Sequence, residues 1–293
     1  MNQRFLILGA FTLLALVLVF EPLKDLMKSA TRSEYYSHIV LIPLVSVYLI
    51  YQKRRSIFSK PEPIYPYGLT LSACGVALYV FGYSQTVKLN PNDYASLLTF
   101  SAIVLWGGGF VCLYGIRGFQ KASFPILFLI FMVPVPSLVI DKIIYVLQVG
   151  STEATAILFG LIGVPVARES FVFQLPGISV EVAKQCSGIR SSLGLFITSI
   201  LAAHFFLQTG WKKAVLILSI FPITVLKNGI RIVALSMLAI HVDERILTQG
   251  FLHHSGGFIF YIPALGLLGM ILWWLKSTEK SEVFDEKLKK NSV

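Results

Sequence analysis

Three stretches of the sequence place polar side chains where an integral membrane helix would favour apolar ones. The first stretch, 182–191, carries Cys186 between the cations Lys184 and Arg190. A thiol at a helix N-terminus lies near unpaired backbone N–H groups and the positive end of the helix dipole, which favour the reactive thiolate. Nearby cations add to this effect. Cys186 is therefore a candidate nucleophile with Arg190 as a possible supporting residue, and the alternative is a packed thiol.

The second stretch lies inside a long apolar run and contains Lys227, Asn228 and Arg231. Charged residues within a membrane helix are costly, so they usually face a polar cavity or a partner. Asn228 and Arg231 are three residues apart and share one helix face. A single basic residue near a helix end can instead extend to the lipid headgroups. Three polar residues in the middle of the run favour a functional role, with Lys227 and Asn228 in support of Arg231.

The third stretch contains the pair His253 and His254, followed by Gly257. A thiol, an imidazole and a guanidinium together suit acyl transfer: the thiolate attacks a carbonyl, the imidazole moves protons and the cation stabilises the oxyanion. Adjacent helical residues point about 100° apart, so one histidine at most faces the other groups squarely. His253 shares a face with Gly257 at i and i+4. His253 and His254 are both candidates for the proton transfer at this point, the other then having a supporting role, and a solvated, inert pair is the alternative.

Composition defines the setting of these residues. The chain has 293 residues, of which 55% are hydrophobic and 14% are charged, and its mean hydropathy is +0.74. Such a chain is an all-α integral membrane protein, and its length accommodates about eight transmembrane helices. We expect residues 1–275 to form one polytopic membrane domain and residues 276–293 to form a polar cytoplasmic tail. The expected spans lie near 5–20, 37–51, 67–83, 95–114, 123–140, 187–207, 214–240 and 256–275.

The segment between the fifth and sixth expected spans is less apolar. Its first half, 141–160, is expected to be a helix that lies in the interface or re-enters it. Its second half, 166–182, has β-branched and aromatic residues around Pro176-Gly177 and predicts a small hairpin over the membrane surface.

Lys and Arg distribution sets the orientation, because the cytoplasmic loops of a membrane protein carry the excess of these residues. The loops on the side of both termini hold the larger share, so both termini are expected to be cytoplasmic, in a cell inner membrane. Segments 141–186 and 241–255 would then be extracytoplasmic, and Cys186, Arg231 and the histidines would approach the same leaflet. The net charge of +10 is spread over short clusters, which indicates lipid headgroup contacts rather than nucleic-acid binding.

The three stretches, taken in order, resemble the exosortase and archaeosortase family of membrane transpeptidases. The resemblance lies in Cys186-Ser187-Gly188-Ile189, in Asn228-x-x-Arg231 and in His253-x-x-x-Gly257-Phe258. It implies a catalytic site of Cys186, Arg231 and His253. It also implies cleavage of C-terminal sorting signals, often with a Pro-Glu-Pro motif followed by a transmembrane helix, from exported proteins.

Two other classes of function remain open at this point. A small transporter or flippase would use the charges of Lys227 and Arg231 to bind its cargo and would not need Cys186. A non-catalytic subunit of an exopolysaccharide export system would need none of the three residues of the proposed site. The sequence suggests no metal site and no organic cofactor.

Overall fold

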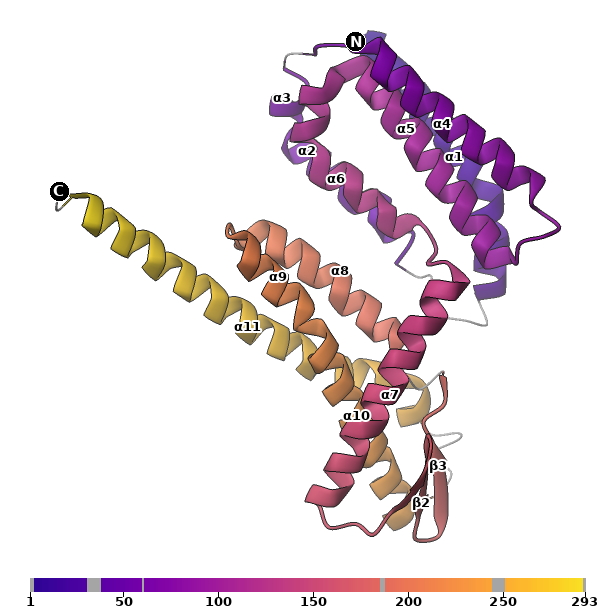
Figure 1. Cartoon of the computed structure of the whole chain (residues 1–293), viewed down its shortest axis with the longest axis vertical. Coiled ribbons are helices and arrows are strands. Elements are labelled where there is room, and N and C mark those ends of the chain that lie inside the picture. The colour runs from indigo at the N-terminus through magenta and orange to yellow at the C-terminus, as the bar shows by residue number, and fades with distance from the viewer. Residues whose placement is uncertain (1–2, 31–37, 60, 185–187, 244–250, 292–293) are drawn as a thin grey trace. The chain divides into compact units, whose positions relative to one another are not determined.

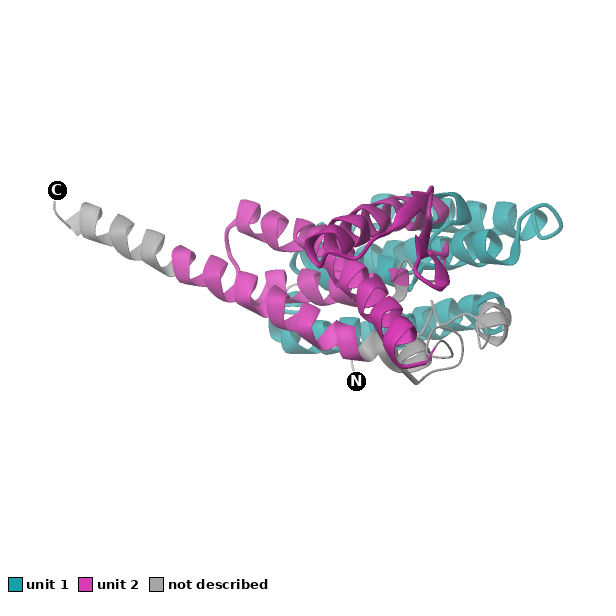
Figure 2. Ribbon diagram, turned by 90° about the horizontal axis from the view of Figure 1, so that it is seen from below, with its two compact units in different colours: residues 1–140 teal, residues 141–293 magenta. Residues whose placement is uncertain are grey.

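The computed structural model describes residues 3–30, 38–59, 61–184, 188–243 and 251–291, which are mostly helical (Figure 1). Within these ranges the side chains of 21, 25–30, 190, 251–258 and 280–291 lie outside the description. The chain divides into two compact units, 1–140 and 141–293 (Figure 2), and the single membrane domain stays a prediction.

In the first unit, α4 and α1 pack closely against α5, and α2 packs against α6 and η2. Small residues on α4 make this packing possible, because Gly68, Gly75 and Gly82 recur every seven residues and are all buried. A Cβ atom at Gly75 would lie only 2.5 Å from the backbone nitrogen of Leu105 on α5. Close approach of backbones through small residues is a common way to pack membrane helices. The elements are α1 (Gln3–Ala30), α2 (Leu41–Gln52), α3 (Arg54–Ile57), α4 (Tyr65–Ser84), α5 (Pro91–Lys121), α6 (Ser123–Phe128) and η2 (Leu129–Met132).

The expected fifth span, 123–140, is not one helix. Helix α6 and the 3-10 helix η2 end at Met132, and Pro134 and Pro136 follow. Proline disfavours the helical conformation in the residue before it and cannot donate a backbone hydrogen bond, so the two prolines interrupt the apolar run. A new helix, α7 (Ser137–Leu161), starts directly afterwards. It is long and apolar enough to cross a membrane, whereas the sequence analysis placed 141–160 in the interface.

The second unit contains a small sheet and the remaining helices. The strands β1 (Ala167–Glu169), β2 (Val172–Leu175) and β3 (Ile178–Glu181) form an antiparallel sheet in the order β1-β2-β3. Strands β2 and β3 are joined at Pro176-Gly177, where Gly177 has a φ of 84°. The sequence analysis expected only a hairpin in this segment. The helices are α8 (Ile189–Phe206), α9 (Gly210–Leu218), α10 (Ile220–His241) and α11 (Phe251–Asn291).

Two hydrophobic clusters hold the second unit together. One of them ties the sheet to α7 and α10, because Phe173 and Val182 pack with Phe159 of α7 and Ile232 of α10. The alternating inward side chains of β2 and β3 supply the sheet's part of this core. The other cluster joins α8, α9, α10 and α11; its buried members include Leu195, Leu216, Ile223, Ala264 and Leu268.

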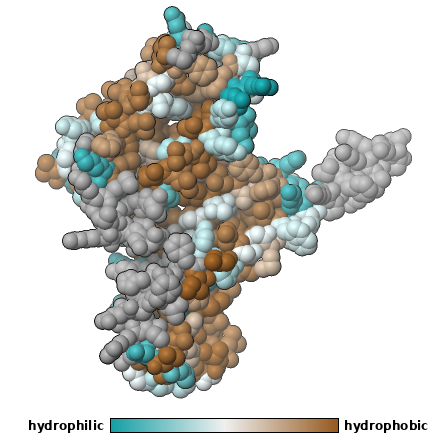
Figure 3. All heavy atoms as spheres, turned by 180° about the vertical axis from the view of Figure 1, so that it is seen from behind, coloured by the Kyte–Doolittle hydropathy of each residue, from teal (hydrophilic) through white to brown (hydrophobic). Residues whose placement is uncertain are grey.

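The helices present large apolar side chains on their outer faces (Figure 3). Leu13, Val17 and Trp273 are 65%, 69% and 71% exposed. Exposed apolar surface on this scale is expected against lipid. Five of the described helical segments are long and apolar enough to span a membrane: Gln3–Phe20, Pro91–Lys121, Ser137–Leu161, Gly210–His241 and Ile259–Glu279. Three shorter apolar segments are Leu41–Gln52, Ser123–Met132 and Ser191–Phe206, and the count of eight spans stays a prediction.

Candidate functional site

Helix α10 carries two buried polar residues in its middle, Lys227 and Asn228, which are 8% and 0% exposed. Asn228 Nδ2 donates a hydrogen bond to Ser151 Oγ of α7 at 3.0 Å. Lys227 Nζ donates to Ser191 Oγ in the first turn of α8. Buried polar groups are stable only when they are hydrogen-bonded, so these two contacts fix α10 against α7 and α8.

Arg231 lies one helical turn beyond this pair on α10. It follows Asn228 by three residues and Lys227 by four, which places all three on one helix face. The side chain of Arg231 is half-buried. A guanidinium group thus lies beside the buried amine and amide.

The turn that precedes α8 packs against the polar residues of α10. Gly188, the N-cap of α8, has a φ of 72°, in the left-handed region. A Cβ atom added to it would lie 3.3 Å from Asn228 Oδ1 and 3.4 Å from Lys227 Nζ. Cys186 precedes Gly188 by two residues in the sequence and lies outside the described residues.

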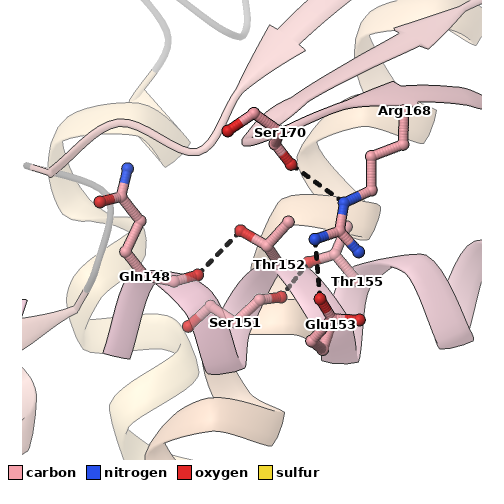
Figure 4. Close-up of polar contacts among 7 residues, drawn as sticks. All are labelled: Gln148, Ser151, Thr152, Glu153, Thr155, Arg168 and Ser170. Carbon is pink, nitrogen blue, oxygen red and sulfur yellow. Dashed lines mark hydrogen bonds and ion pairs between the residues drawn. The ribbon is translucent and has the colours of Figure 1, made fainter. Parts of the chain in front are cut away.

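Helix α7 contacts the chain just after β3, before the segment that contains Cys186. Gln148, which is 6% exposed, donates from Nε2 to the carbonyl oxygen of Val182 at 2.5 Å, where β3 has just ended. Figure 4 shows Gln148 in a polar row on α7 with Ser151, Thr152 and Thr155. The two threonine hydroxyls donate to carbonyls of their own helix, at 2.8 and 2.7 Å. Gln148 and Ser151 are thus the members of the row that bond to other elements.

An ion pair holds β1 against α7. Arg168 Nη2 donates to Glu153 Oε1 at 2.7 Å, and Arg168 Nε donates to the carbonyl oxygen of Ser170 at 3.0 Å (Figure 4). The hydrogen bond to Glu153 raises the pKa of Arg168, whose guanidinium is charged at neutral pH in any case. Because both side chains are partly exposed, this pair contributes little stability and serves mainly to orient the strand.

The structure brings together some of the residues that the sequence indicated. Lys227, Asn228 and Arg231 share one face of α10. Cys186 lies outside the described residues, and so do the side chains of Arg190, His253 and His254. Their convergence with Arg231 stays a prediction.

The sequence analysis missed three residues that hold the site: Gln148, Ser151 and Ser191. For Gln148 and Ser151 the available signal was a helical spacing of uncharged polar residues at 148, 151, 152 and 155. A polar row within a long apolar helix indicates a face that packs against other polar groups.

Comparison with known protein families gives a match over most of the chain. A family model described as transmembrane exosortase matches residues 29–270, which include Cys186, Arg231 and His253. Neither the curated proteins nor the solved structures gave a match. Because the match extends over most of the chain, the protein belongs to the transmembrane exosortase family.

Proposed function

We propose that this chain is a membrane-embedded cysteine transpeptidase or endopeptidase that removes C-terminal sorting signals of the Pro-Glu-Pro type from exported proteins. One observation carries the proposal: the turn at Gly188 packs against Lys227 and Asn228, one helical turn from Arg231. The segment with the only sequence-indicated nucleophile thus adjoins a polar, cationic part of a membrane helix. Such an environment favours a thiolate and stabilises negative charge in a transition state.

The proposed reaction has two steps. The Cys186 thiolate attacks the scissile carbonyl, and Arg231 stabilises the resulting oxyanion. The C–N bond breaks as the departing amine takes a proton from His253, which leaves a thioester on Cys186. A second nucleophile, which is water, an amine or a lipid group, gives its proton to His253 and attacks the thioester. The C–S bond breaks, and the Cys186 thiolate is restored.

The two cations of α10, Lys227 and Arg231, have different roles in this proposal. Lys227 is bonded to Ser191 in the first turn of α8, so it positions the helix that follows the nucleophile. Arg231 is assigned to the substrate, because a guanidinium offers a planar fork of donors that suits an oxyanion. In a site shielded from water, such a charge acts more strongly than it does in solution.

The proposal includes an orientation in which both termini are cytoplasmic and Cys186 faces outward. The substrate is an exported protein whose C-terminal transmembrane helix lies in the same bilayer, and lipids contact the apolar outer faces of the helices. Support comes from the Lys and Arg distribution. An impermeant thiol reagent applied to intact spheroplasts should label Cys186 from outside. Labelling that occurs only in inside-out vesicles would reverse the orientation.

The chemistry is tested with purified protein in lipid vesicles and a tagged substrate that contains a sorting signal and its transmembrane helix. Wild-type protein should cleave the substrate and form an adduct on Cys186 that hydroxylamine releases, as expected for a thioester. Cys186→Ala should form no adduct and give no cleavage, whereas Cys74→Ala and Cys112→Ala serve as matched controls with normal cleavage.

The same variants distinguish the two other classes of function. A transporter would keep moving its cargo in Cys186→Ala and lose this activity when Lys227 or Arg231 is replaced. A non-catalytic export subunit would support exopolysaccharide secretion with Cys186, Arg231 and His253 each replaced in turn. Either result would overturn the peptidase assignment.

A further inference from the structure

The sheet of the second unit has an edge that leads towards Cys186. In an antiparallel pair, the opposed residues alternate between those that exchange hydrogen bonds and those that do not. The backbone N–H of Val182 donates to the carbonyl of Phe171 at 2.9 Å, which fixes the phase of this alternation between β2 and β3. By the register, Ser179 and Glu181 then belong to the non-bonded pairs. Their N–H and C=O groups point away from β2, towards the outer edge of β3.

Among the residues that the structure describes, none pairs with this outer edge. Strand β3 is last in the order β1-β2-β3, and the side chains of Ser179 and Glu181 are both exposed. Within the described part of the chain, no group bonds to the outward backbone atoms of these two residues. An open strand edge is a template for pairing with an extended peptide, which gains main-chain hydrogen bonds there.

The position of β3 in the chain distinguishes its edge from that of β1. Four residues separate Glu181 from Cys186 in the sequence, and Gln148 holds the end of β3 through Val182. The edge of β1 is two strand spacings away, about 10 Å. It carries Arg168, which is tied to α7 through Glu153. A peptide paired with β3 therefore runs along the strand that continues into the nucleophile segment.

We propose that the outer edge of β3 binds the extended segment of the exported substrate next to the scissile bond, as an added β-strand. This inference rests on the proposed peptidase function and adds the mode of substrate binding. Ser179 and Glu181 each offer one donor and one acceptor, so the edge supplies up to four main-chain hydrogen bonds. Recognition through the main chain tolerates varied side chains and orders an extended segment beside the thiol.

A series of substrates with single amide-to-ester replacements tests this pairing in the intact protein in vesicles. Each replacement removes one backbone N–H near the scissile bond and keeps the side chain. Only every second N–H of an added strand faces β3, so we expect KM to rise at alternate positions, by about 2- to 12-fold for one lost hydrogen bond. The kcat should stay within about twofold. A uniform effect along the series, or none, would overturn the proposal.

Ser179→Pro tests the protein side of the same contact. Proline at this position removes an outward N–H and keeps the bonds between β2 and β3, since edge strands tolerate proline at such sites. We expect KM of the Ser179→Pro variant to rise by a similar factor, with kcat retained. With this variant, KM should also alternate less strongly along the series of ester substrates. Ser179→Ala, which keeps the N–H, is the comparison variant, and we expect KM with it to alternate along the ester series as strongly as with wild-type protein.

The outcomes separate this proposal from the function on which it rests. If Ser179→Pro fails to fold, the ester series on wild-type protein still decides the question. If wild-type protein forms no adduct on Cys186, the peptidase function fails, whatever the edge binds. If Ser179→Pro abolishes crosslinking between two copies of the chain but leaves KM unchanged, the edge pairs copies with each other and the substrate proposal is wrong.

Discussion

Replacing Gly188 with alanine is a direct test of the turn that precedes α8. The residue has a φ of 72°, and the left-handed conformation costs a residue with a Cβ about 1–2 kcal/mol. The added Cβ would also lie 3.3 Å from Asn228 Oδ1 and 3.4 Å from Lys227 Nζ, which requires shifts of the neighbouring side chains of a few tenths of an ångström. The flexible lysine absorbs such a shift easily, so the backbone term dominates.

The energetic cost of Gly188→Ala appears either in the cleavage activity or in the stability of the protein. If the turn relaxes, its native conformation becomes about 5- to 30-fold less populated, and kcat/KM for reporter cleavage in vesicles should fall by the same factor. If the turn keeps its shape, the strain should lower the free energy of unfolding by about 1–2 kcal/mol. Measuring cleavage and thermal unfolding on the same preparation covers both cases.

Gly194→Ala provides the matched control in the same helix. A Cβ at Gly194 would lie 3.6 Å from the Tyr261 hydroxyl, an ordinary van der Waals contact. Alanine is favoured over glycine in a helix interior by about 1 kcal/mol, so this variant should be as stable as wild type or more stable, with normal cleavage. If Gly188→Ala matches Gly194→Ala in both measurements, the argument from the left-handed turn is wrong.

Four further substitutions test the site. Arg231→Lys should lower kcat by about 10²-fold or more with normal membrane insertion, because an ammonium lacks the planar fork of donors; near-normal turnover would remove Arg231 from the mechanism. His253→Ala should lower cleavage by about 10²- to 10⁴-fold and His254→Ala by less than about threefold, and the opposite pattern would reverse the assignment. Gln148→Met keeps the volume of the side chain but removes the donor to the carbonyl after β3, so kcat/KM and the alkylation rate of Cys186 should both change by about 2- to 12-fold. A Gln148→Met protein that unfolds more easily but alkylates at the wild-type rate would show a purely structural role.

The polar residues of α10 were predictable because charge within an apolar run is a strong signal. Lys227 and Arg231 are costly in a bilayer unless the protein solvates them, so their presence alone indicates a partner. The partners themselves were not predictable. Ser191 and Ser151 are short hydroxyl residues that occur in many membrane helices, and only the packing of α7, α8 and α10 shows that they meet the amine and the amide.

The error in the fifth expected span explains why Gln148 was missed. Hydropathy is averaged along the chain, so the prolines at 134 and 136 did not divide the run from 123 to 140. Residues 137–140 were then counted in the fifth span, and 141–160 were expected to lie in the interface or re-enter it, where a polar side chain needs no partner. The strand β1 was missed for a different reason: Ala167–Glu169 is short, entirely exposed and without apolar alternation.

Small residues between α7 and α10 determine whether the two helices can hold the nucleophile segment. A Cβ at Gly229 would lie 3.0 Å from the Cβ of Ala154, and one at Gly150 would lie 2.9 Å from a methyl of Val225. The backbones therefore approach closely, which is the condition for a direct bond between side chains as short as those of Asn228 and Ser151. Helix α7 also bonds to the end of β3, while α10 contacts the turn that precedes α8. Both ends of the segment that contains the nucleophile thus depend on one helix pair, so a shift of α7 against α10 changes the separation of those ends.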